Sequence, residues 1–174
     1  MIAMKMYYAV KPLLPRRLQL ALRRVRAQRI LRSSAAVWPI QPGSEKPPEG
    51  WTGWPGGKQF ALVLTHDVDT QRGQDRCEPL MAMEENAGFR SAFYIVPERY
   101  PVRADLRDQL VSRGFEVGVH GLNHDGRLYS SKEVFESRAA RINEYLRNWG
   151  CSGFRSPAMH CNLEWLGKLD AARA

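Results

Sequence analysis

The sequence predicts an α/β fold, in which about four parallel strands are covered by helices. The first observation is that short apolar runs alternate with longer helical patterns from residue 58 onward. The second is that the connections are short and punctuated by glycine, as in parallel sheets with helical crossovers. The third is the length of 174 residues with 44% hydrophobic content, which is enough for a single core.

The four strands are each predicted from a short apolar run bounded by turn residues. The first run is FALVLT, the second SAFYIV, the third FEVGVH and the fourth CSGFR. In order, the predicted strands cover residues 60–65, 91–96, 115–120 and 151–155. Because ligands bind at the carboxyl ends of strands in such folds, the residues that follow each strand are the first candidates for a site.

Three helices are predicted between these strands. The first two, over 78–88 and 104–114, each end at a glycine, which is the common residue just beyond a helix. The third runs from about Ser131 to Trp149, and Ser131 with Glu133 nearby is typical of a helix start. The order from residue 58 is therefore strand and helix in alternation, ending with the fourth strand.

The chain divides by composition into three predicted regions. Residues 1–38 form a basic amphipathic helical segment, in which Leu18, Leu22 and Val25 share one face with most arginines opposite. Residues 39–57 are rich in proline and glycine and are predicted to be a linker. Residues 58–174 form the α/β domain.

The net charge of +8 is concentrated at the N-terminus. Nine of the 26 basic residues precede the first acidic residue, Glu45, so the remaining 17 basic and 18 acidic residues leave a net charge of −1. A nucleic-acid partner is therefore not expected for the domain. Residues 11–32 could bind an anionic membrane surface, although a solvated helix or one that packs on the domain is the simpler interpretation.

Compartment is inferred from the cysteines and from the N-terminal sequence. The three cysteines form an odd set without C-x-x-C spacing, which argues against a disulfide framework and against a thiolate zinc site. The start of the chain lacks the apolar core and cleavage site of a secretory signal, and no run of 18 apolar residues occurs. We therefore expect a cytoplasmic protein, with peripheral membrane attachment through the basic segment as an alternative.

Chemically active side chains follow the first and third strands. Asp67 and Asp69, spaced i and i+2, can point to one side if the strand stays extended there. His120 and His124, spaced i and i+4, would meet if a helical turn follows the third strand. Two imidazoles and one carboxylate make a metal site with open positions for water and substrate, as hydrolytic centres require.

The fourth strand ends at Arg155, whose guanidinium could hold a carboxylate through paired hydrogen bonds, with Asp67 as the natural partner. A thermolysin-type H-E-x-x-H site is rejected because Gly121 stands where that motif needs its glutamate. The metal itself stays open: zinc is the default, but cobalt, nickel or iron would also accept these ligands.

The clusters T-H-D-V-D, H-G-L-N-H and F-R-S-P, in this order, resemble the first three motifs of the NodB-homology polysaccharide deacetylases, carbohydrate esterase family 4. The first motif departs from the usual T-F-D-D of that family. The resemblance implies Asp67 as general base, Arg155 as the residue that positions it, and Asp69, His120 and His124 as metal ligands. The roles of the two aspartates could be exchanged.

The activity implied by this resemblance is metal-dependent hydrolysis of a carbon–nitrogen bond in an N-acetylated sugar or similar amide, as part of carbohydrate metabolism. The resemblance covers roughly residues 58–169 and lacks the later motifs, so we expect a truncated domain, an incomplete (β/α) barrel, with doubtful activity of its own. The alternatives are a catalytically incomplete metal-binding fragment, or a binder of membranes or nucleic acid through the basic tail.

Overall fold

The computed structural model describes residues 14–37, 40 and 42–171. It divides into two units, Met1–Ala61 and Leu62–Ala174, which are considered separately below. The predicted N-terminal segment lies outside the described residues over 1–13 and at residue 38, as do residues 39 and 41 of the predicted linker.

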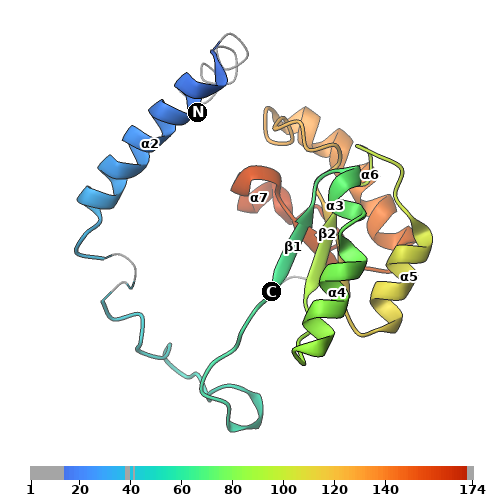
Figure 1. The fold of residues 1–174 in the computed structure, drawn as a ribbon, viewed down its shortest axis with the longest axis horizontal. Helices are drawn as coiled ribbons and strands as arrows, with labels where there is room; N and C mark the ends of the chain where they lie inside the picture. The colour runs from blue at the N-terminus through green and yellow to red at the C-terminus, as the bar shows by residue number, and fades with distance from the viewer. Residues whose placement is uncertain (1–13, 38–39, 41, 172–174) are drawn as a thin grey trace. The chain divides into compact units, whose positions relative to one another are not determined.

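The first unit contains helix α2, Arg16–Ser33, and a short 3₁₀ turn, η2, Pro55–Gly57 (Figure 1). α2 begins directly after Pro15, and none of its residues is buried within the described part of the chain. Its apolar side chains Leu18, Leu20, Leu22, Val25, Ile30 and Leu31 are 45–55% exposed. Membrane binding through residues 11–32 therefore stays a prediction. No described helix is long and apolar enough to cross a membrane.

The second unit is built on a sheet of four parallel strands in the order β1-β2-β3-β4. The strands are β1 Thr65–Val68, β2 Ala92–Ile95, β3 Glu116–His120 and β4 Gly153–Arg155. This arrangement confirms the predicted α/β class with four parallel strands. Because all four strands are parallel, their carboxyl ends lie together at one end of the sheet.

The predicted bounds of the first strand are wrong. The strand begins at Thr65 and not at residue 60, and the side chains of Phe60, Leu62 and Val63 are 78%, 61% and 79% exposed. β1 lies at the edge of the described sheet, and its pairing with β2 begins at Thr65 opposite Ala92. An apolar run without a pairing partner has no ladder to join. As a consequence, Asp67 lies inside the strand.

The helices follow the predicted order, with three short additions. The long helices are α4 Cys77–Asn86, α5 Ala104–Ser112 and α6 Lys132–Asn148, and the short ones are α3 Gln71–Gln74, α7 Leu163–Leu166 and the 3₁₀ turn η3 Pro157–Met159 (Figure 1). The predicted start of α6 is confirmed, because the Oγ of Ser131 accepts a hydrogen bond from the backbone N–H of Val134 at 3.3 Å.

The core lies between one face of the sheet and the long helices. Alternate strand residues Val68, Phe93, Ile95, Val117 and Val119 are buried on this face. Most of them pack with Met81 of α4 and with Leu106 and Leu110 of α5. Val119 packs with Phe135, Ile142 and Leu146 of α6. The intervening residues of each strand point the other way, and they include Asp67, Tyr94, His120 and Arg155.

Candidate metal centre

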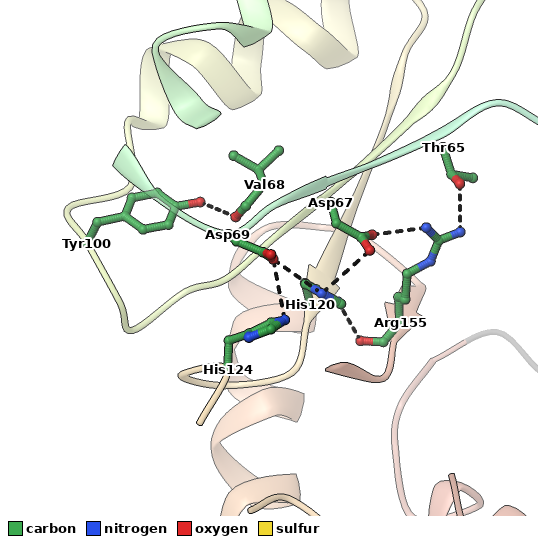
Figure 2. Close-up of polar contacts among 8 residues, drawn as sticks. All are labelled: Thr65, Asp67, Val68, Asp69, Tyr100, His120, His124 and Arg155. Atoms are coloured by element: carbon green, nitrogen blue, oxygen red, sulfur yellow. Dashed lines mark hydrogen bonds and ion pairs between the residues drawn. The ribbon is translucent and has the colours of Figure 1, made fainter. Parts of the chain in front are cut away.

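The side chains predicted to bind metal come from the carboxyl ends of β1 and β3. Figure 2 shows Asp67 and Asp69 from β1 and the residue after it, with His120 and His124 facing them. β2 lies between the two strands, so the aspartates and histidines reach across it at the edge of the sheet. Because the carboxyl ends of parallel strands lie together, side chains more than 50 positions apart in the sequence meet there.

Asp69, His120 and His124 each offer one ligand atom, and these three atoms lie within 4.8 Å of one another. Oδ1 of Asp69 is 3.4 Å from Nε2 of His120 and 3.5 Å from Nε2 of His124. This oxygen is buried and has no hydrogen-bond partner among the described residues. A buried carboxylate oxygen without a partner is costly, and a cation held by the three atoms would satisfy it. The donor set therefore fits a divalent metal.

His120 is held in the tautomer that a metal ligand needs. Its side chain is only 2% exposed, and Nδ1 lies 3.0 Å from the carbonyl oxygen of Arg155. A carbonyl can only accept, so Nδ1 carries the proton and the lone pair of Nε2 faces Asp69. Burial, the largest effect, lowers the pKa of His120 below its usual value despite the nearby carboxylates. A neutral imidazole is the form that binds metal.

The expected helical turn between the two histidines is wrong. Residues 121–124 form no helix, and Gly121 and His124 both have left-handed backbones, with φ of 64° and 52°. A Cβ on Gly121 would lie 2.4 Å from Cγ of Pro157, so only glycine fits in this turn. The two imidazoles nevertheless meet, with ring centroids 5.1 Å apart.

Asp67 lies beside the three ligand residues and is held by Arg155. Nη1 of Arg155 donates to Oδ1 of Asp67 at 2.9 Å, the pairing predicted from the sequence. Nη2 of Arg155 donates to Oγ1 of Thr65 at 2.7 Å. The other carboxylate oxygen of Asp67 is 3.7 Å from Nε2 of His120. The two aspartates therefore differ: one faces both histidines, and the other is bound to the arginine.

Three supporting residues were not predicted from the sequence. Thr65 stands in the T-H-D-V-D motif, so its position was a signal that could have been used. The hydroxyl of Tyr100 donates to the carbonyl oxygen of Val68, between the two aspartates, at 2.5 Å (Figure 2). The Arg155 guanidinium lies over the ring of Tyr94, 4.6 Å from its centroid. Neither tyrosine follows a pattern that links it to the site.

His66, to which the sequence assigned no role, lies on the opposite face of β1. Its Nε2 is 2.7 Å from Oε1 of Glu84, and its ring centroid is 4.9 Å from that of Phe93. Oε2 of Glu84 also accepts a hydrogen bond from Oγ of Ser91 at 2.7 Å. His66 therefore helps to pack α4 against the sheet.

Comparison with known proteins gives matches at the level of structure. No family model matches the sequence, and no curated protein matches it. The structure of the peptidoglycan deacetylase PdaC from Bacillus subtilis superposes with a TM-score of 0.50 at 17% identity, over 64% of this chain and 56% of that one. A protein from Mycobacterium smegmatis, assigned as a polysaccharide deacetylase, gives 0.51 at 19% identity, over 68% of this chain and 50% of that one.

These matches are informative about the fold. The chain spans about half the length of the two solved structures. Their sequences are too different for the likeness to carry more than architecture. The four parallel strands and their helices thus form part of the same fold as the NodB-type polysaccharide deacetylase barrels.

Proposed function

We propose that this chain carries the metal-binding part of a hydrolase that cleaves the carbon–nitrogen bond of an N-acetyl group on a carbohydrate. The observation that carries the proposal is that two neighbouring aspartates at the carboxyl end of the sheet have different partners. Asp69 faces His120 and His124, whereas Asp67, two residues earlier, is bound to Arg155. A hydrolytic centre needs one group to hold the metal and another to handle protons.

In this proposal Asp69, His120 and His124 hold the metal. A divalent ion bound there would lower the pKa of water and polarise the acetyl carbonyl. Zinc is the default, since two imidazoles and a carboxylate with open positions are typical of its catalytic sites, and cobalt, nickel or iron would also fit. The hydrogen bond from His120 to the Arg155 carbonyl keeps one ligand oriented.

Asp67 is proposed to be the general base. Its carboxylate lies next to the ligand atoms, and the Arg155 guanidinium holds one of its oxygens while the other faces the site. In the overall reaction, water adds to the acetyl carbon, the carbon–nitrogen bond breaks, and the proton ends on the amine, so that acetate and a free amine are released.

A second candidate is metal binding without turnover. It is favoured because the chain spans only about half the length of the deacetylase structures that it matches. Groups that complete a catalytic centre in a full-length barrel can come from any of its strand ends. The two candidates share the same metal ligands and differ only in catalysis.

Metal analysis of the purified chain tests the feature that both candidates share. We expect about one zinc ion per chain after loading and dialysis. Asp69→Ala and His120→Ala should each lose this metal, because either change leaves two ligands. Asp108→Asn, which neutralises an exposed carboxylate on α5, is the control and should keep it. Unchanged stoichiometry in both ligand variants would rule out the site.

Acetate release from an N-acetylglucosamine oligomer separates the two candidates. If Asp67 is the general base, Asp67→Asn should keep the metal and lower turnover by about a hundredfold or more. A zinc-loaded wild-type chain that releases no acetate would exclude the deacetylase for this chain and leave metal binding without turnover. A zinc-loaded chain in which Asp67→Asn releases acetate at the wild-type rate would exclude Asp67 as the base.

A further inference from the structure

Two hydrogen bonds and one aromatic contact hold the Arg155 guanidinium. Two of its nitrogens donate along its edge, Nη1 to Asp67 at 2.9 Å and Nη2 to Thr65 at 2.7 Å (Figure 2). Its face lies over the aromatic ring of Tyr94, with the central carbon 4.6 Å from the ring centroid. The two edge bonds fix the guanidinium within its own plane, and the ring restricts movement out of that plane.

The ring of Tyr94 lies in space that Gly118 leaves free, with Gly153 beside it. In the sheet, Tyr94 is opposite Asp67 on β1 and Gly118 on β3, and Gly118 is opposite Gly153 on β4. A Cβ on Gly118 would lie 2.6 Å from two ring carbons of Tyr94, and one on Gly153 would lie 3.4 Å from Cε1. Neither glycine has a positive φ. A Cβ on Gly118 would also lie 2.9 Å from the carbonyl oxygen of Gly153, so close packing, and not backbone conformation, explains the glycine at 118. A Cβ on Gly153 would make only ordinary contact with the ring.

We propose that Tyr94 is a positioning residue for Arg155. The ring packs against Gly118 on one side and lies beneath the guanidinium whose Nη1 donates to Asp67. Without the ring, Arg155 could still reach Asp67 but would sample other rotamers, since an arginine side chain has several rotatable bonds. The catalytic consequence rests on the proposed function, whereas the contact between ring and guanidinium can be tested without it.

The test uses NMR of the full-length chain and follows the Nε–Hε signal of Arg155, assigned by its loss in Arg155→Lys. A proton near an aromatic face experiences a ring-current shift, so Tyr94→Leu should move this signal toward the position seen for free arginine. Tyr94→Phe keeps the ring and should restore the wild-type position. Phe89→Leu is the matched control, because it removes an exposed aromatic ring beyond the end of α4.

A structural role alone would not produce the expected kinetic pattern. Tyr94→Leu should keep its zinc and lower kcat for acetate release about tenfold, with KM changed less, because Tyr94 acts through Arg155 and Asp67. Tyr94→Phe should recover most of the lost kcat. An equal loss in both variants would overturn the assignment to the ring.

The spectroscopic outcome stands apart from activity. An Arg155 signal that does not move in Tyr94→Leu would overturn the inference, even if the wild-type chain is an active deacetylase. A shift in Tyr94→Leu and its reversal in Tyr94→Phe would support the contact, even if no acetate is released. If Tyr94→Leu does not fold, the wild-type chain suffices: cross-relaxation between the Tyr94 ring protons and the Arg155 side chain must be present, and its absence would refute the contact.

Discussion

Gly121, which directly follows His120, is the position where a single added methyl group should have the clearest effect. Its φ of 64° costs a non-glycine residue about 1 to 2 kcal/mol. The new Cβ would also lie 2.4 Å from Cγ and 2.8 Å from Cδ of Pro157, a ring that cannot rotate away, and such overpacking costs about 1 to 3 kcal/mol. The stiffer unfolded chain offsets about 0.4 to 1 kcal/mol. Gly121→Ala should therefore lower the free energy of unfolding by about 1 to 4.6 kcal/mol.

Urea denaturation of the metal-free chain at 25 °C measures this difference, with Gly88→Ala as the matched control. Gly88 has a φ of 76°, but a Cβ added there would meet no atom within 4 Å, so this position carries the backbone cost alone. Its net loss should be about 0 to 1.6 kcal/mol, without the roughly 1 to 3 kcal/mol that the contact with Pro157 adds at Gly121. If Gly121→Ala costs no more than Gly88→Ala, the contact with Pro157 is not rigid and the reasoning from steric fit is wrong.

Two further predictions use pKa shifts. The Arg138 guanidinium, bound to both oxygens of Asp125 at 2.7 Å, holds the pKa of Asp125 below its usual value. Asp125 therefore adds to the free energy of unfolding above its unfolded pKa, and this stabilisation is lost as the pH falls through the lower pKa of the folded state. Asp125→Asn should cost about 1 kcal/mol at pH 7, and urea unfolding should show a smaller difference below about pH 4; a difference that persists undiminished at pH 2 would contradict this. Burial raises the pKa of Cys77 to about 11, whereas Cys161 is exposed. At pH 8, mass spectrometry should find Cys161 alkylated by iodoacetamide well before Cys77, and equal rates would refute the assignment.

Local patterns were sufficient to predict most of the elements and the four side chains at the candidate metal centre. Apolar runs located β2, β3 and β4 because strands that pack against helices need such runs. Asp67 and Asp69 were identified because they follow an apolar run at the strand spacing that places both on one side. The same reasoning was wrong for the start of β1, where Phe60, Leu62 and Val63 are exposed and the pairing with β2 begins only at Thr65.

The difference between Asp67 and Asp69 came only from the folded chain. In the sequence their roles could be exchanged, since both follow the same run. In the structure one faces His120 and His124, and the other is bound to Arg155 from a strand 88 residues away. Such contacts depend on the register across three strand pairs, which no local window of sequence contains.

By itself, the sequence determined the residue types at the candidate site and the strands that carry them, because periodicity and strand-end position are properties of neighbouring residues. Only the tertiary structure decided how those residues are supported. The turn at Gly121 is shaped by contact with Pro157, and Tyr94 lies under Arg155 because Gly118 leaves room for its ring. These are packing relations between segments distant in sequence, and their physical cause is the close fit of a folded interior.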